Sequence, residues 1–123
     1  MTTILQIDDL EAMHHLVRAL LANRSDTRLI STASGMEGLA LAKSEKPNLI
    51  LLDVDMPEMR GPDVLARLKS DPSTADIPVV VVSGSAEMEV IDAMLANGAL
   101  HHLAKPFTEL ALFAVVDSFQ GPT

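Results

Sequence analysis

Short apolar runs alternate with amphipathic helical patterns along the whole chain, and this alternation restricts the fold more than any other feature of the sequence. Two of the runs, Leu49–Leu52 and Val79–Val82, contain four consecutive apolar residues. A continuous apolar run of this length is typical of a strand that is buried on both faces of a parallel sheet. Strands that alternate with helices favour an α/β fold in which helices cover both faces of the sheet.

The alternation predicts five strand–helix units. The expected strands are Ile4–Ile7, Arg28–Ala33, Leu49–Leu52, Val79–Val82 and Ala99–Ala104. The expected helices are Glu11–Ala22, a helix that Ser34 caps and that ends near Ser44, then Pro62–Lys69, Ala86–Ala96 and Thr108–Phe119. Glu37 stands three residues after Ser34, which is the spacing of a capping box. Gly98 can take the left-handed conformation that ends a helix.

Size and composition restrict the class of protein. A chain of 123 residues is long enough for one domain, which we expect to span residues 1–123. The formal net charge of -8 and the absence of any Lys/Arg run argue against a nucleic-acid-binding surface. No apolar run approaches the ~20 residues of a membrane helix. The chain has no Cys and no signal peptide at its N-terminus, so we expect a cytoplasmic protein.

Chemically active side chains follow four of the expected strands. The first strand is followed by Asp8 and Asp9, the third by Asp53, the fourth by Ser83 and the fifth by Lys105. Because the carboxyl ends of parallel strands meet at one edge of a sheet, these side chains are expected to converge there. Each of them alone has an ordinary structural explanation, such as a helix cap or the end of a strand. Their joint occurrence favours a functional site.

The charges of this set indicate what the site binds. Three carboxylates within a few ångströms repel one another, and a single lysine offsets only one of them. Mg²⁺ is bound by carboxylates while it keeps positions for phosphate oxygens. An ammonium and a hydroxyl are suited to contact further phosphate oxygens, and a carboxylate can itself act as the nucleophile. The set therefore predicts a magnesium-assisted phosphoryl transfer.

The sequence resembles the bacterial response-regulator receiver domains over nearly its whole length. Four segments carry the resemblance, in the same order and at the same separations as in that family: Asp8-Asp9, Leu51–Gly61 with its Met-Pro pair, Pro78–Gly84, and Gly98–Phe107 with its Lys-Pro-Phe ending. The resemblance implies a flavodoxin-like, doubly wound α/β fold, with a five-stranded parallel sheet of order 2-1-3-4-5 and five helices.

The resemblance also implies a role for each residue of the site. Asp53 is the implied phosphoacceptor, and Mg²⁺ is implied to bind Asp8, Asp9, Asp53 and the backbone carbonyl of Asp55. Lys105 is implied to contact the phosphate and to precede a cis peptide bond to Pro106. Ser83 is implied to turn inward and donate a hydrogen bond to the phosphate.

Two positions depart from the family's pattern. His102 stands where the family usually has Tyr or Phe, a ring that moves together with the residue at the position of Ser83. A titratable imidazole in its place raises the hypothesis of a pH-sensitive switch at His102. Arg60 stands where the family often has Asp, which changes the charge near the loop. The pairs His14-His15 and His101-His102 are assigned to the surface or to packing, because adjacent residues of a helix or strand do not share a face.

The predicted function is that of a single-domain response regulator. It receives a phosphoryl group from a histidine kinase or a histidine phosphotransfer protein, binds a target or relays the group, and has no independent turnover substrate. An alternative is a pseudo-receiver adaptor that acts by protein contact alone, and a weaker one is a small metal-dependent phosphatase. The resemblance implies that the fourth helix, fifth strand and fifth helix form the face for a target or a homodimer.

Overall fold

Within the residues that the structure describes, 1–84 and 88–119, five parallel strands form one sheet in the order β2-β1-β3-β4-β5. The structure is a computed structural model. The strands are β1 (Thr2–Ile7), β2 (Thr27–Thr32), β3 (Leu49–Asp53), β4 (Val79–Ser83) and β5 (His101–Ala104). Both the strand order and the parallel pairing confirm the predicted fold class.

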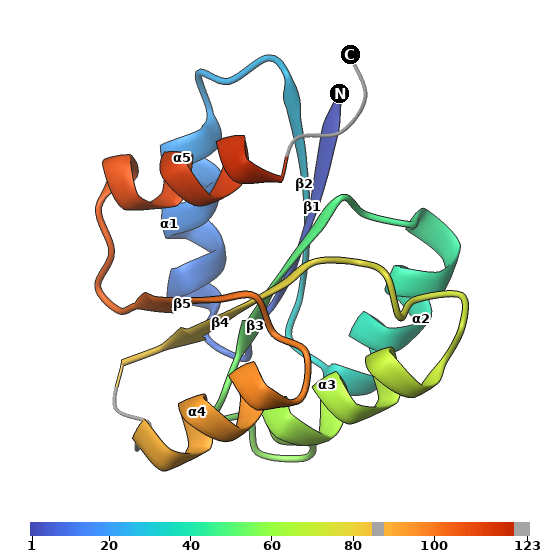
Figure 1. The fold of residues 1–123 in the computed structure, drawn as a ribbon. Helices are drawn as coiled ribbons and strands as arrows, with labels where there is room; N and C mark the ends of the chain where they lie inside the picture. Colours follow the sequence, from blue (N-terminus) through green and yellow to red (C-terminus); the bar gives the residue numbers. More distant parts are fainter. Residues whose placement is uncertain (85–87, 120–123) are drawn as a thin grey trace.

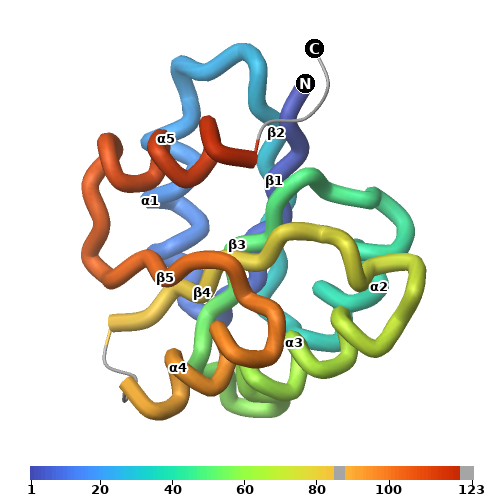
Figure 2. Tube along the Cα trace, viewed as in Figure 1, coloured from blue at the N-terminus to red at the C-terminus, as the bar shows by residue number. Residues whose placement is uncertain are grey.

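Helices cover both faces of this sheet (Figure 1). They are α1 (Glu11–Leu21), α2 (Gly35–Glu45), α3 (Gly61–Ser70), α4 (Met88–Ala96) and α5 (Glu109–Ser118). Figure 1 shows α1 and α5 together on one face and α2, α3 and α4 on the other. The chain path in Figure 2 shows the strands and helices alternating along the sequence, as the apolar pattern predicted.

The two layers of helices enclose separate apolar cores. On the α1/α5 face, buried residues of the strands pack against α1 and α5: Ile4, Leu49, Leu51, Val80, Val17, Leu21, Leu112 and Val116. On the other face they pack against α2, α3 and α4: Leu5, Ile7, Ile50, Leu52, Val81, Ala42, Leu65 and Met94. Neighbouring residues of β3 belong to opposite cores, which explains why that strand is apolar at consecutive positions.

The connections out of β1 and β3 place the carboxyl ends of these strands at the switch point of the sheet. The two strands are neighbours, with Ile7 opposite Leu52. The chain leaves β1 toward α1 on one face, whereas it leaves β3 toward α3 on the other. In doubly wound sheets a crevice opens where the connections part in this way, and ligands bind there.

Local sequence signals account for most of the helix ends. Ser34 caps α2 by accepting a hydrogen bond from the Glu37 N–H at 3.2 Å. The second half of the predicted capping box is not formed, because the Ser34 N–H donates to Thr32 Oγ1 instead. Thr108 caps α5 and accepts from the Ala111 N–H. Gly98 adopts a φ of 117° after α4, as expected of a glycine that ends a helix.

The fifth strand begins two residues later than predicted, at His101. Ala99 lies outside the strand because its N–H donates to the Met94 carbonyl at 3.0 Å and closes the end of α4. The predicted start of the fourth helix at Ala86 lies outside the described residues. No helix in the part of the chain that the structure describes is long and apolar enough to cross a membrane. One domain over residues 1–123 stays a prediction.

Candidate phosphoryl-transfer and metal site

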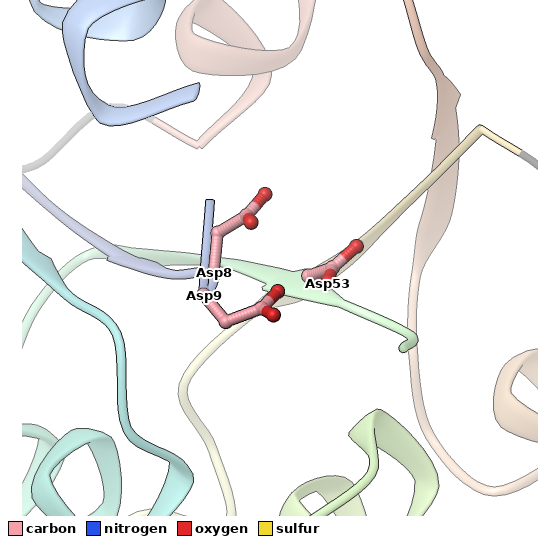
Figure 3. A group of neighbouring side chains, drawn as sticks. All are labelled: Asp8, Asp9 and Asp53. Atoms are coloured by element: carbon pink, nitrogen blue, oxygen red, sulfur yellow. The ribbon is translucent and has the colours of Figure 1, made fainter. Parts of the chain in front are cut away.

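Three carboxylates from two neighbouring strands meet at the carboxyl edge of the sheet (Figure 3). Asp8 and Asp9 follow β1 directly, and Asp53 is the last residue of β3. Each offers an oxygen atom, and these oxygens all lie within 4.8 Å of one another. Asp8 and Asp53 are buried, with exposed fractions of 2% and 5%, so water solvates their charges poorly. The predicted convergence of these residues is therefore present in the structure.

Lys105 brings the positive charge to this cluster. Its Nζ lies 2.9 Å from Asp8 Oδ2 and 3.1 Å from Asp53 Oδ1, so one ammonium bridges the two buried carboxylates. The peptide bond from Lys105 to Pro106 is cis, as the resemblance implied. The Lys105 N–H also donates to the Ser83 carbonyl at 2.9 Å, which fixes the end of β5 against the end of β4.

Burial and charge give Asp53 an unusual acidity. Burial is the main cause that raises the pKa of Asp53 to about 6, and the charge of Asp8 raises it further, while the hydrogen bond from Lys105 opposes both effects. Burial lowers the pKa of the Lys105 ammonium, but the hydrogen bonds to Asp8 and Asp53 outweigh this effect and the net shift is upward. One cation for three carboxylates leaves the cluster with excess negative charge, which a divalent cation can balance.

The donor set fits a hard cation. All the donor atoms that meet here are carboxylate oxygens, and hard oxygen ligands are those that Mg²⁺ and Mn²⁺ prefer. The chain contains no Cys, so a thiolate site for a softer metal is excluded. Lys105 contacts one oxygen of Asp8 and one of Asp53, so it holds both carboxylates in position while it occupies part of their binding capacity.

Ser83 and His102 lie beyond this cluster on the adjoining strands. Ser83 is the buried last residue of β4, and it is paired with Ala104. His102 is half-buried on β5, opposite Val81. Strand alternation places Ser83 and His102 on the same face of the sheet, on a diagonal between neighbouring strands. Among the described residues, His102 Nε2 is a buried nitrogen with no hydrogen-bond partner.

The loop after β3 carries Asp55 and Arg60. Arg60 Nη2 lies 3.2 Å from Asp55 Oδ1, and both side chains are largely exposed. The base of the loop is closed by a hydrogen bond from the Gly61 N–H to the Val54 carbonyl at 2.8 Å. The positive charge of Arg60 is therefore engaged with the carboxylate of Asp55.

A cleft opens beside Asp9, between the loops that follow β1, β2 and β3. Its volume is about 580 Å³, and its walls include Met36, Met56 and Met59. Asp9 is part of the lining, so one of the three carboxylates borders the cleft. Pro57 and Glu58 of the loop after β3 complete this side of the site.

Sequence reasoning missed one contact at the site. His14, assigned to the surface or to packing, directs Nε2 to the backbone carbonyl of Asp8 at 2.7 Å. The neighbouring His15 behaves as expected, with an exposed side chain 3.8 Å from Glu11. Two adjacent histidines on one helix give no sequence signal that only the first of them turns toward the acidic pair.

Comparisons with known proteins agree with this geometry. The sequence model of the "Response regulator receiver domain" family matches residues 4–117. The chain is 40% identical over 116 residues to response regulator PleD of Caulobacter vibrioides, covering 94% of this chain but only 25% of PleD. It is 30% identical over 119 residues to the polar-differentiation response regulator DivK of Brucella ovis, covering 97% of this chain and 96% of DivK.

A solved structure shows the same fold together with a metal. The Mn²⁺-bound form of response regulator Rcp1 is 30% identical to this chain, with a TM-score of 0.77, and the match covers 96% of this chain and 91% of Rcp1. The match to the family extends from β1 to the last turn of α5 and therefore includes every strand end of the site. The chain belongs to the response regulator receiver domains, the family of signalling domains found in two-component systems.

Proposed function

We propose that this chain is a phosphorylation-dependent switch in which Asp53 accepts a phosphoryl group in a Mg²⁺-dependent reaction. The main support for this proposal is the buried Asp53 carboxylate, which has Asp8 and Asp9 oxygens within 4.8 Å and the Lys105 ammonium at 3.1 Å. Membership of the receiver family and the Mn²⁺ in Rcp1 support this role. Mg²⁺, held by Asp8, Asp9, Asp53 and the Asp55 backbone carbonyl, would supply positive charge to the oxygens of the transferring group.

The proposed donor is a phosphohistidine of a histidine kinase or a histidine phosphotransfer protein. A carboxylate oxygen of Asp53 attacks phosphorus, a P–O bond forms, and the P–N bond to the donor imidazole breaks. The imidazole leaves with the bonding electron pair and takes up a proton. The chain's own contribution is to hold the nucleophile and the neighbouring charges in position, so the expected catalytic effect comes from positioning and electrostatics.

Lys105 and Ser83 are the proposed contacts of the bound phosphoryl group. Lys105 Nζ already lies 3.1 Å from Asp53 Oδ1. A small movement would therefore let it donate a hydrogen bond to an oxygen of the phosphoryl group on Asp53. Ser83 ends the neighbouring strand and offers a hydroxyl donor. His102 lies on the same face of the sheet as Ser83, and we propose that its ring responds when Ser83 turns toward the phosphate. Its buried, unpartnered Nε2 is compatible with a second ring position.

The proposed output is a contact with a target protein or a second copy of the chain through α4, β5 and α5. β5 is an edge strand, paired only with β4 among the described residues. Exposed apolar residues lie on this part of the molecule: Leu95, Leu100 and Leu110, with exposed fractions of 38%, 58% and 81%. Exposed apolar groups of this kind favour a role in protein contact. Sedimentation of the phosphorylated and unphosphorylated protein would show whether a dimer forms.

Mass spectrometry of the intact protein tests the phosphorylation itself. The wild type is incubated with acetyl phosphate and Mg²⁺, and in parallel with a phosphorylated histidine phosphotransfer protein. We expect a gain of about 80 Da that is lost with EDTA and in Asp53→Asn. Asp92→Asn is the matched control, because Asp92 is an exposed carboxylate of α4 that does not belong to the acidic cluster.

Two outcomes would contradict the proposal. A wild type that gains no mass with either donor would favour the adaptor that acts by contact alone. Equal labelling of the wild type and Asp53→Asn would place the phosphoryl group on another residue. Steady release of phosphate from added phosphomonoesters would instead support the phosphatase alternative.

A further inference from the structure

His14 makes a short hydrogen bond to the backbone of the acidic pair. It stands on the second turn of α1, and its Nε2 lies 2.7 Å from the carbonyl oxygen of Asp8. A carbonyl oxygen can only accept a hydrogen bond, so Nε2 must carry the proton and donate it. The distance is at the short end of the range for an N–H···O bond. In the neutral ring this contact corresponds to the Nε2–H tautomer, and it also fixes the direction of the ring.

The carbonyl that His14 holds belongs to the peptide bond between Asp8 and Asp9. A peptide unit is planar, so fixing the direction of this carbonyl restricts ψ of Asp8 and φ of Asp9. These two torsions determine how the Asp8 and Asp9 side chains are directed relative to each other. We propose that His14 is a positioning residue for the metal site, which sets the relative orientation of Asp8 and Asp9 before a divalent cation binds.

One other contact of Asp8, the hydrogen bond from the Leu10 N–H to Asp8 Oδ1, also spans this peptide unit, whereas His14 acts on its carbonyl oxygen. The Asp8 N–H donates to the Thr32 carbonyl at 3.0 Å, and Asp8 Oδ1 accepts from the Leu10 N–H at 2.9 Å. Lys105 holds Asp8 Oδ2. For the half-buried Asp9, no hydrogen bond or ion pair to its carboxylate is present among the described residues. The direction of the Asp9 side chain therefore depends on the backbone between Asp8 and Asp9, which the Leu10 N–H contact and His14 restrain together.

The helix that carries His14 is itself attached to β1 at the neighbouring residue. Gln6 is buried on β1 and donates from Nε2 to the Met13 carbonyl at 3.1 Å, while its Oε1 accepts from Ser31 Oγ at 3.0 Å. The chain thus has a reciprocal pair of contacts, one from a strand side chain to α1 and one from an α1 side chain to the end of the strand. These contacts hold α1 against β1, so the position of His14 is itself fixed. A group that orients metal ligands needs such support.

The affinity for Mg²⁺ tests this inference, which rests on the Mg²⁺ site of the proposed function. We compare the wild type with His14→Leu, His14→Gln and the matched control His15→Leu. His15 is the adjacent histidine on the same helix, and its side chain is 75% exposed. Calorimetry should show that His14→Leu raises the Kd for Mg²⁺ by about three- to tenfold, since neighbours that orient metal ligands have effects of this order or larger. His15→Leu should leave the Kd unchanged.

Gln offers an N–H donor of similar reach, so His14→Gln should bind Mg²⁺ more tightly than His14→Leu. A purely structural role would lower the melting temperature in His14→Leu without this pattern in Kd. Equal Kd values for His14→Leu and His15→Leu would overturn the inference while leaving the proposed function intact. A wild type that binds no Mg²⁺ would overturn both.

The protonation of the His14 ring in the wild type provides a second test, which does not require His14→Leu to fold. A long-range ¹H–¹⁵N spectrum reports which ring nitrogen carries the proton. We expect the Nε2–H tautomer for His14, and a change in its ring signals when Mg²⁺ is added. An Nδ1–H tautomer would overturn the inference, because Nε2 could not then donate to Asp8.

Discussion

Gly61 packs directly against the backbone of Asp53, because a Cβ atom at position 61 would lie 2.5 Å from the carbonyl oxygen of Asp53. The same Cβ would lie 2.9 Å from Val54 Cα. Both contacts are with the backbone at the end of a central strand, which cannot turn aside as a side chain can. The loop after β3 therefore returns close beneath the candidate phosphoacceptor only because residue 61 has no side chain.

Gly61→Ala is expected to reduce both stability and Mg²⁺ affinity. The added methyl group forces the end of β3 or the start of α3 to shift, at a cost of about 2–4 kcal/mol in the free energy of unfolding. Gly38→Ala is the comparison, since its Cβ would lie 2.5 Å from Ile7 Cδ1 and 2.8 Å from Ile7 Cγ1, which are side-chain atoms and not backbone atoms. Urea unfolding should show the larger loss for Gly61→Ala, and equal losses would contradict this reading.

Lys105 occupies carboxylate oxygens that a divalent cation would also use. Lys105→Met leaves Asp8 and Asp53 buried without their cation, so we expect a loss of about 2–4 kcal/mol in stability when no metal is added. Mg²⁺ should then stabilise Lys105→Met more than the wild type, because the cation no longer competes with the ammonium. Melting temperatures with and without Mg²⁺ measure the difference.

The control for that experiment is Lys43→Met. Lys43, in the last turn of α2, is 60% exposed and pairs with Asp71 at 2.9 Å, so its removal should leave the response to Mg²⁺ unchanged. If Mg²⁺ stabilises the wild type and Lys105→Met equally, Lys105 and the cation do not share these oxygens.

The fold and most of the candidate site could be predicted because their signals are local. The continuous apolar run Leu49–Leu52 predicts a buried strand, and the polar Asp53 marks the end of that strand. The parallel arrangement then brings Asp8, Asp9, Asp53 and Lys105 to one edge whatever the intervening loops contain. The proximity of these side chains therefore follows from topology, while their roles as metal ligands were implied by the family resemblance and stay a prediction.

The contacts that could not be predicted depend on side-chain direction. His14 and His15 are indistinguishable in the sequence, yet only His14 contacts the Asp8 carbonyl. The start of β5 was misplaced because the Ala99 N–H bonds to the Met94 carbonyl across a glycine turn. Which rotamer a ring adopts, and which of two carbonyls an N–H reaches, is decided by tertiary packing.

Arg24 joins the loop after α1 to α5 and should contribute to stability without affecting the site. Its guanidinium contacts Asp26 at 3.1 Å and Asp117 at 2.7 Å, and it lies over the ring of Phe113. We expect Arg24→Ala to cost about 1–2 kcal/mol in the free energy of unfolding.

Because Arg24 lies at the amino ends of the strands, its removal should leave the Kd for Mg²⁺ unchanged. Arg28→Ala is the control. Arg28 makes an exposed pair with Glu45 at 3.3 Å, so its loss should cost less than about 0.5 kcal/mol. Denaturant unfolding compares the two variants, and equal costs would show that the Arg24 contacts add nothing.

The raised pKa of Asp53 predicts opposite effects of pH on metal binding and on stability. With a pKa of about 6, Asp53 is mostly protonated at pH 5, so the apparent Kd for Mg²⁺ should rise about tenfold between pH 7.5 and pH 5. The pKa of Asp53 in the folded protein lies above the ordinary Asp value of 3.8, so its contribution to stability is full below pH 3.8 and is lost as the pH rises through 6. Without metal, Asp53→Asn should therefore melt a few degrees higher than the wild type at pH 7.5, with a smaller difference at pH 5. A difference in melting temperature that does not change with pH would show that burial does not raise this pKa.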